Sequence, residues 1–347
     1  MKKYLFSLLS ILLIFSVFGT SFANDDNVQN GNEIADLITD NAFVDNNQVY
    51  PAPLPEAAKG QTIPMDKGYI VEEIGDGIYA VMDGIFSTMF MTTGQGVIAV
   101  DAPLTLGEKY LEAIKEVTDE PIKYVIYTHA HQDHIGSASM FPDDVKIYAH
   151  EETAKILEER QDPNRPVPTR TFKGDKQRIQ IGDKKIELDY VGQNHQDGNI
   201  FISVPDQKVL MAVDVIFPGW VPFRYLAISE DIPGWIDAHY KILEYDFDTL
   251  VSGHVTRLGT REDVEIQIEY IEDIIETTKR AMQEVSQFEI GQQVGFENPW
   301  YLMDVYYNEV IKVANAELVP RWVDRLGGAD IYTWQHISEI LDMLRLE

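Results

Sequence analysis

The chain has 347 residues, of which 45% are apolar and 24% charged, so it is long enough to bury a large core and has the composition of a globular protein. Its formal charge of −29 would repel the phosphates of a nucleic acid, which argues against nucleic-acid binding. The same charge would repel an anionic membrane surface. With no cysteine, the chain has no disulfide, no thiolate metal ligand and no cysteine nucleophile. A small substrate that is apolar, neutral or cationic remains compatible with this charge.

The chain begins like an exported protein. Lys2 and Lys3 precede an apolar run over residues 5–18, and Ser21-Phe22-Ala23 has the small-x-small pattern of a signal-peptide cleavage site. The apolar run is shorter than the ~20 residues that a stable membrane-spanning helix needs, which disfavours the alternative, an uncleaved anchor. We expect residues 1–23 to be a signal peptide cleaved after Ala23, and the protein to be periplasmic or secreted without a stable membrane anchor.

After the signal peptide, composition and periodicity divide the chain. Residues 24–66, rich in Asn, Asp, Gln and Pro, are predicted to form a flexible arm or linker with at most one short helix, near residues 33–38. A catalytic domain is predicted over residues 67–260, and its alternating elements indicate an α/β protein in which helices cover sheet faces. Strands are predicted at residues 77–82, 87–92, 97–101, 123–127, 145–149, 178–181, 185–190, 199–204, 208–213 and 249–252, and helices at residues 107–117, 152–160 and 232–243.

Residues 261–347 are predicted to form an all-helical C-terminal extension. Val264, Ile268 and Ile271 mark the apolar face of its first helix. Asn298-Pro299 is expected to begin a further helix that Pro320 stops, and Thr333 to begin the last one. The ordinary amphipathic spacing favours packing or homodimerisation, and a lid over an active site is the alternative.

The histidines are distributed unevenly along the chain. Residues 128–136, THAHQDHIG, contain His129, His131, Asp133 and His134 between a predicted strand and a predicted helix. Imidazole and carboxylate are the ligands of Zn²⁺ and related cations when thiolates are absent. Four such groups in six residues therefore indicate two metal ions rather than one.

Three further candidate ligands follow predicted strands downstream. His195 lies in a loop between two strands, and Asp214 and His254 each follow an apolar strand, so all could meet at one edge of a sheet. Any one of these residues alone would be better interpreted as a capping acid or a core histidine, but the ordered set would not. Structural or solvent-exposed roles are predicted for the remaining histidines, which lack such partners: His150, His239 and His336.

The order of these seven residues resembles the complete ligand set of the metallo-β-lactamase-fold hydrolases, over about residues 67–260. The resemblance implies an αββα sandwich, to which the helical extension is added, and two Zn²⁺ ions at one sheet edge, with Fe or Mn as alternatives. One metal site would consist of His129, His131 and His195, the other of Asp133, His134 and His254, and Asp214 would bridge them.

The resemblance also implies a mechanism. A hydroxide held between the two metals would attack the substrate at neutral pH. Asp133 would orient this hydroxide or help to protonate the leaving group. Asp101, which matches an early aspartate of the family, would orient the metal-binding loop.

Two positions narrow the branch of the family that the chain resembles. His131 stands where di-iron oxidoreductases of this fold carry Glu, and Asp214 stands where all-histidine β-lactamases typically carry Ser. A bridging Asp is typical of thioesterases, lactonases and phosphodiesterases of the fold, so we predict a hydrolase of a small ester, lactone, thioester or amide with apolar character. The alternatives are an all-histidine β-lactamase, a hydrolytic dehalogenase and, in another class, a non-catalytic metal-binding or assembly protein.

Contacts to a small-molecule substrate are predicted from two loops. Phe217, Trp220 and Phe223 lie in an aromatic, proline-rich segment after Asp214 and would form an apolar wall of the cleft, while the neighbouring Arg224 would bind a substrate carboxylate. Packing of this segment under the C-terminal helices is an equally supported alternative. The turn over residues 83–87 takes the position of the family's flap, with Phe86 as its contact residue.

Overall fold

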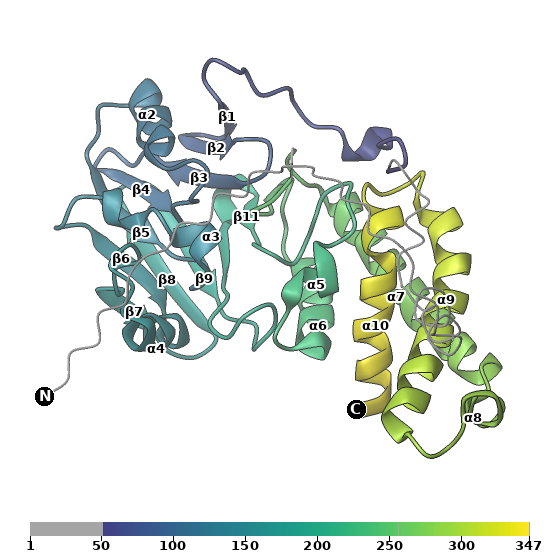
Figure 1. Cartoon of the computed structure of the whole chain (residues 1–347). Helices are drawn as coiled ribbons and strands as arrows, with labels where there is room; N and C mark the ends of the chain where they lie inside the picture. Colours follow the sequence, from purple (N-terminus) through teal and green to yellow (C-terminus); the bar gives the residue numbers. More distant parts are fainter. Residues whose placement is uncertain (1–50, 256, 347) are drawn as a thin grey trace, which may run out of the picture. The chain divides into compact units, whose positions relative to one another are not determined.

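The structure of the protein, a computed structural model, describes residues 51–255 and 257–346 (Figure 1). All of them belong to one structural unit, Asn46–Glu347. The predicted signal peptide, its cleavage after Ala23 and the short helix near residues 33–38 lie outside the described residues. Within the described residues, no helix has both the length and the apolar composition that crossing a membrane requires.

Two β-sheets form the centre of the fold. In the seven-stranded sheet the order is β1 to β7, with β1–β4 antiparallel and β4–β7 parallel. In the five-stranded sheet the order is β12-β11-β10-β9-β8, and only β11 and β12 are parallel neighbours. The strands are β1 Ile70–Gly75, β2 Ile78–Met82, β3 Ser87–Met91, β4 Val97–Val100, β5 Ile122–Ile126, β6 Lys146–His150, β7 Arg170–Phe172, β8 Lys176–Ile181, β9 Lys184–Asp189, β10 Phe201–Val204, β11 Val209–Met211 and β12 Thr249–Val251.

Helices α2 to α6 alternate with strands along the chain, and α7 to α10 form its C-terminal part (Figure 1). The α-helices are α2 Glu108–Val117, α3 Gln132–Ile135, α4 Glu151–Arg160, α5 Arg224–Ile228, α6 Ile232–Ile242, α7 Arg261–Glu284, α8 Gln287–Val294, α9 Pro299–Trp322 and α10 Ala329–Leu346. Three short 3-10 helices are η1 Glu56–Ala58, η2 Ala138–Met140 and η3 Pro205–Gln207.

Three hydrophobic clusters correspond to the three interfaces of a four-layer sandwich. Because side chains alternate between the two faces of a strand, Ile202 of β10 faces the first sheet while its neighbour Phe201 faces the helices on the other side. The outer face of the first sheet is covered by α2 and α4, through residues such as Tyr110 and Leu157. The predicted αββα sandwich with an all-helical C-terminal extension is therefore confirmed.

The C-terminal helices share one core with the second sheet. Leu250 of β12, Val264 of α7 and Ile337 of α10 belong to the same buried cluster, which also contains Phe201. The extension thus covers the outer face of the second sheet together with α6, and burial of its apolar faces is the main source of its stability.

The end of α9 differs from the prediction. Pro320 does not stop the helix, which continues to Trp322. Trp322 is buried, its ring lies 5.1 Å from that of Tyr270, and its indole N–H donates to Asp273 at 2.7 Å. These contacts hold the last turn although proline removes one helical hydrogen bond. The final helix likewise begins at Ala329, earlier than the predicted Thr333.

Part of the predicted N-terminal arm lies against the domain. Within residues 51–66, Ala58 is buried, and its carbonyl accepts a hydrogen bond from Trp220 Nε1 at 3.0 Å. The preceding carbonyl, of Ala57, accepts from Arg257 Nε at 2.7 Å. A Cβ at Gly219 would lie 1.9 Å from the Ala57 oxygen, so only glycine permits this approach. Residues 57–58 of the predicted arm therefore contact the domain, whereas residues 59–66 are mostly exposed.

Candidate metal centre

The seven candidate ligands meet at the edge where several strands end. His129 and His131 follow β5, Asp214 follows β11 and His254 follows β12, while His195 lies between β9 and β10. Their ligand atoms form two groups, in each of which all atoms lie within 4.8 Å of one another. The first group is His129, His131, His195 and Asp214, and the second is Asp133, His134 and His254. The structure thus brings all seven residues together, and their role as metal ligands remains a prediction.

Asp214 connects the two groups. Its Oδ2 lies 3.1 Å from both His134 Nε2 and His195 Nε2, and 3.3 Å from His129 Nε2. Its Oδ1 lies 2.8 Å from His254 Nε2. Burial alone would raise the pKa of Asp214, but the surrounding imidazoles lower it well below its ordinary value. Asp214 is therefore an ionised carboxylate that contacts both groups, the geometry expected of a bridging ligand.

A chain of three side chains fixes the orientation of His129. Asp101 follows β4 and is fully buried, and it accepts hydrogen bonds from Thr128 N at 2.8 Å and Thr128 Oγ1 at 2.7 Å. Burial raises the pKa of Asp101 to about 7, although the His134 imidazole and the Thr128 hydrogen bonds act in the opposite direction. The Thr128 hydroxyl donates its only hydrogen to Asp101 Oδ2. It can therefore only accept from His129 Nδ1, which lies 3.1 Å away.

This arrangement leaves the other nitrogen of His129 without a proton. Burial lowers the pKa of His129 well below its ordinary value, so the ring is neutral and its hydrogen is on Nδ1. Nε2 then presents a lone pair to the Asp214 carboxylate 3.3 Å away, and it forms no hydrogen bond with any described residue. A cation between these two acceptors would pair with both.

Two further pairs of ring nitrogens face each other. His131 Nδ1 lies 2.8 Å from His195 Nε2, and His134 Nε2 lies 3.1 Å from His254 Nε2. This donor set contains only nitrogen and oxygen, which fits Zn²⁺ and also Fe or Mn. The residues present therefore suit the metal ions that the sequence predicts.

The two groups differ in their exposure and protonation. Burial and the neighbouring His195 lower the pKa of His131 to about 4. Burial would also lower the pKa of His134, but nearby carboxylates, Asp214 foremost, raise it to about 9. The Asp133 side chain is 48% exposed, against 5% for Asp214, and its Oδ2 lies 3.6 Å from His134 Nε2. Asp133 is thus the carboxylate of the centre that faces solvent.

Buried amides connect the ligand-bearing loops. Asn194 Oδ1 accepts from His195 N at 2.6 Å and from Asn199 Nδ2 at 2.9 Å. Asn199 Nδ2 also donates to the carbonyl of Val213, next to Asp214, at 3.1 Å. These contacts fix the His195 loop to the end of β11.

The loop between β5 and α3 is held at Ala130, between His129 and His131. Gln196 Oε1 accepts from Ala130 N at 2.9 Å, and Arg165 Nη1 donates to Ala130 O at 2.7 Å. None of these supporting residues is predicted by the sequence patterns above. Gln196, like Asn194 and Asn199, lies beside His195 in the sequence, which is a usable signal, but Arg165 offers none.

The helical extension reaches the centre through Gln267 of α7. This buried side chain accepts from Phe217 N at 2.8 Å and donates to Val215 O at 2.6 Å, on both sides of Ile216. From α6, Trp235 Nε1 donates to the carbonyl of Asp214 itself at 2.9 Å. Asp214 has φ 62°, in the left-handed region that Asp tolerates better than most residues. Contacts from both helices therefore hold the backbone around the bridging residue.

Phe86 lies over the second group of ligands. Its ring centroid is 4.5 Å from that of His254 and 5.5 Å from that of His134. An isolated β-bridge pairs Phe86 with His254, and Ser87 N donates to Gly253 O at 2.9 Å. The turn between β2 and β3 thus has Phe86 beside the centre, where the sequence predicts a flap residue.

The four contact residues predicted after Asp214 have different surroundings. Phe217 is buried and stacks on His254 at 5.8 Å, whereas Trp220 pairs with Gly327 and Phe223 lies 5.5 Å from Tyr332 of α10. Arg224 is exposed, with its guanidinium 4.9 Å from the neighbouring Tyr225 ring. The segment therefore packs in large part on the C-terminal helices, the alternative noted above.

The remaining histidines have structural contacts. His150 accepts from Glu152 N at the start of α4 and stacks on Tyr190 at 4.1 Å. His239 lies 2.8 Å from the Trp235 carbonyl, and His336 lies 2.8 Å from the hydroxyl of Tyr270. These contacts agree with the structural roles predicted for them.

The chain is similar to one protein-family model and to several characterised proteins. The family model "Metallo-beta-lactamase superfamily" matches residues 84–254, which contain all seven candidate ligands. The 2,4-dinitroanisole O-demethylase subunit alpha of Nocardioides sp. (strain JS1661) is 32% identical over 208 residues, 55% of this chain and 59% of that protein. Metallo-beta-lactamase IND-1 of Chryseobacterium indologenes is 27% identical over 137 residues, 39% of this chain and 56% of that protein. The chain thus spans less than two thirds of either relative.

A solved structure shows the same fold. The metallo-beta-lactamase from Pontibacter korlensis superimposes with a TM-score of 0.50 at 20% sequence identity, over 58% of this chain and 97% of that chain. At this identity the similarity concerns the fold alone.

Proposed function

Because the chain belongs, through residues 84–254, to the metallo-beta-lactamase superfamily, we propose that it is a hydrolase of small molecules that uses two metal ions per chain. One observation carries this proposal: seven imidazole and carboxylate side chains form two adjacent groups that Asp214 bridges. Bound Zn²⁺, or Fe or Mn in its place, would activate water at neutral pH and polarise the scissile oxygen of the substrate. No protein nucleophile is needed for this chemistry.

The protein side chains would divide the remaining tasks. Asp214 holds the two groups at a fixed separation, and the chain from Asp101 through Thr128 keeps His129 Nε2 free of a proton. Asp133 is the catalytic carboxylate of our proposal. Half-exposed beside His134 and 3.9 Å from His254 Nε2, it can accept a proton from water and pass one to the leaving group.

The substrate class is inferred from the surroundings of the centre. Phe86 offers an aromatic surface beside His254, which suits an ester, lactone, thioester or amide with an apolar or aromatic portion. A second candidate is an activated aryl ether, since one relative is named as an O-demethylase of 2,4-dinitroanisole and Phe86 would stack on such a ring. A β-lactam is a third candidate, from the name of the Chryseobacterium relative.

The first experiment combines metal analysis with a substrate panel. We expect about two metal ions per chain, and turnover of at least one member of a panel of lactones, thioesters, aryl esters, amides, phosphodiesters, β-lactams, haloalkanes and 2,4-dinitroanisole. Removal of the metal with a chelator should abolish turnover and Zn²⁺ should restore it. Activity that persists in metal-free protein would contradict the proposal, and failure of the whole panel with metal-loaded protein would favour a non-catalytic metal-binding role.

Matched variants test the assigned residues. His131→Ala should lose metal and activity, whereas Asp133→Asn should lose activity by several hundredfold or more while the protein stays folded. Asp143→Asn, an exposed acid between η2 and β6, serves as the control and should behave like the wild type. Equal activity of Asp133→Asn and Asp143→Asn would remove Asp133 from the mechanism.

We further propose that the enzyme acts outside the cytoplasm after cleavage of residues 1–23. The basic start, short apolar run and small residues before Asn24 support this proposal. Expression of the full chain in a bacterium, followed by N-terminal sequencing of the periplasmic and secreted fractions, should give a mature chain that begins at Asn24. An uncleaved chain retained in the membrane fraction would refute it.

A further inference from the structure

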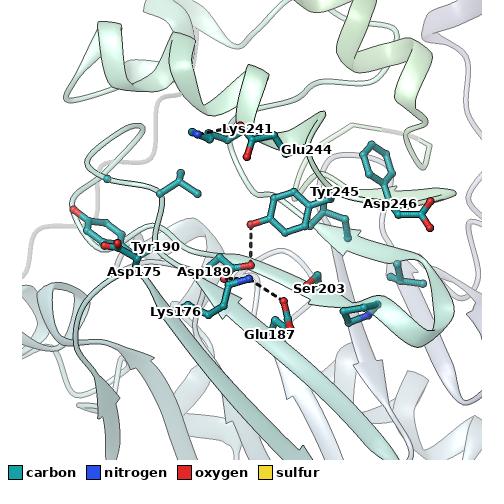
Figure 2. A pocket seen from close by; sticks show the side chains of 16 residues that line it. Asp175, Lys176, Glu187, Asp189, Tyr190, Ser203, Lys241, Glu244, Tyr245 and Asp246 are labelled. Atoms are coloured by element: carbon teal, nitrogen blue, oxygen red, sulfur yellow. Dashed lines mark hydrogen bonds and ion pairs between the residues drawn. The ribbon is translucent and has the colours of Figure 1, made fainter.

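Helix α6 has an exposed side and a buried side. Lys241, near its end, and Glu244, in the turn that follows, border a cavity on the outer face of the five-stranded sheet (Figure 2). The buried side has the spacing of one helix face and consists of Trp235, Ala238, His239 and Ile242. His239 is therefore a fully buried imidazole, and its ring nitrogens need partners inside the protein.

Both ring nitrogens of His239 have a partner. Nδ1 lies 2.8 Å from the carbonyl oxygen of Trp235, which can only accept, so Nδ1 carries the hydrogen of the ring. Burial lowers the pKa of His239 to about 4, so the ring is neutral at neutral pH and Nε2 is an acceptor. Gln267 of α7 donates to this Nε2 at 2.6 Å. The contact therefore joins α6 to the helical extension and requires one tautomer of His239.

The backbone after Asp214 occupies the rest of the Gln267 amide. Its Oε1 accepts from Phe217 N at 2.8 Å, and its Nε2 donates one hydrogen to Val215 O at 2.6 Å. The second hydrogen of Nε2 goes to His239, so every hydrogen of the amide is used. Gln267 is only 1% exposed. Without the acceptor on His239, one buried N–H would be unpaired, which favours another orientation of the amide.

The same hydrogen bonds enclose the backbone of Asp214. Trp235, whose carbonyl faces His239, donates its indole N–H to the carbonyl of Asp214 at 2.9 Å. Val215, whose carbonyl accepts from Gln267, is the next residue in the chain. Asp214 has φ 62°, a conformation that surrounding contacts must hold. Because this backbone sets the direction of the side chain, it also sets where the carboxylate lies between the two groups of ligands.

We propose that His239 is a positioning residue of the metal centre: it sets the orientation of the Gln267 amide, which holds the backbone after Asp214 and thereby the bridging carboxylate. His239 acts through Gln267 and Trp235 rather than on a metal ion. Its effect on metal binding rests on the proposed function, whereas its effect on the backbone is present in the metal-free protein.

Two variants with side chains of equal length separate the hydrogen bond from the space that the ring fills. The amide oxygen of His239→Gln can accept from Gln267, whereas the thioether of His239→Met is only a weak acceptor. Amide hydrogen exchange of the metal-free protein measures the result. We expect Phe217 N–H to exchange at least tenfold faster in His239→Met, and within threefold of the wild type in His239→Gln. Equal exchange rates in the two variants would overturn the proposal.

Zn²⁺ affinity, measured by competition with a chromophoric chelator, tests whether the effect reaches Asp214. His239→Met should bind Zn²⁺ at least tenfold more weakly than the wild type, and His239→Gln within threefold of it. His336→Met is the matched control, because His336 is equally buried and its Nδ1 lies 2.8 Å from the Tyr270 hydroxyl. The control should bind Zn²⁺ like the wild type.

The possible failures can be told apart. An equal loss of affinity in His239→Met and His336→Met would assign the effect to general destabilisation and overturn the proposal. A wild-type protein that binds no metal would instead contradict the proposed function, and the exchange rates of the metal-free variants distinguish this failure from the first.

A double variant tests the route through Gln267. If His239 acts by orienting this amide, His239→Met should have no further effect once Gln267 is replaced. We therefore expect the Zn²⁺ affinity of the double variant His239→Met, Gln267→Met to lie within twofold of that of Gln267→Met alone. Additive losses would show that His239 acts by another route and would overturn the proposal.

Discussion

Replacement of Thr128 by valine tests whether the contacts behind His129 orient it. Valine keeps the shape and β-branching of threonine and removes only the hydroxyl group. That hydroxyl donates to Asp101 at 2.7 Å and lies 3.1 Å from His129 Nδ1. The variant therefore leaves Asp101 with one hydrogen bond from residue 128 instead of two, and it removes the partner of the His129 ring.

The structure sets the expected magnitude. Asp101 and His129 are both fully buried, so water cannot replace the lost partner. Because a buried polar group left unpaired costs about 1–3 kcal/mol, we expect Thr128→Val to lower the free energy of unfolding of the metal-free protein by about 2–4 kcal/mol. Free rotation and tautomer exchange of His129 should also weaken metal binding by roughly 10- to 100-fold.

Urea unfolding followed by circular dichroism measures the first effect, and competition with a chromophoric chelator measures the second. Thr278→Val is the matched control, since Thr278 of α7 is equally buried and its hydroxyl has no hydrogen-bond partner among the described residues. The control should be neutral or slightly stabilising. If the two variants have the same stability and the same metal affinity, the contact through Thr128 does not orient His129 and the reasoning is refuted.

Three further predictions concern the flap, the loop contacts and the extension. Phe86→Ala should raise KM for the best substrate roughly tenfold through loss of its ring surface, with exposed Ile85→Ala as an unaffected control in steady-state kinetics. Asn199→Ala removes the donor to two buried acceptors and should cost about 1–3 kcal/mol in urea unfolding; a change below about 0.5 kcal/mol would contradict this. Ile337 lies in the core that the extension shares with the second sheet, so Ile337→Ala should shift a single unfolding transition and lower the free energy of unfolding by about 2–5 kcal/mol. Two transitions, of which only one shifts, would show that the extension unfolds independently.

Local patterns in the sequence predict most of the strands and the candidate ligands, and the resemblance of the ordered ligand set to a known family implies the αββα sandwich. Apolar strands followed closely by His or Asp are visible in the chain, and the carboxyl ends of parallel neighbours such as β11 and β12 lie at the same edge of a sheet. The strands missed by the pattern are β1 and β7, at the two edges of the first sheet. Partial exposure in β1 and a length of three residues in β7 weaken the alternation that identifies a strand.

Other features depend on contacts far apart in the sequence or on rare backbone conformations. Arg165 and Gln267 contact the ligand loops across 35 and 52 residues of chain, and neither has a local signature. In α5, Tyr225, Leu226 and Ala227 all have positive φ, although none of these residue types favours the left-handed region. The segment packs on α10, far away in the sequence, and local propensity does not predict its conformation.

The contacts of Gln267 have a consequence for how this chain can evolve. A residue of the C-terminal helices supplies the hydrogen bonds that the backbone after Asp214 lacks within the sandwich. Loss or exchange of α7 would therefore leave two buried backbone groups unpaired beside the bridging ligand. The extension and the segment after Asp214 are expected to be inherited together, and a graft of this loop into a shorter member of the superfamily should succeed only with a substitute for Gln267.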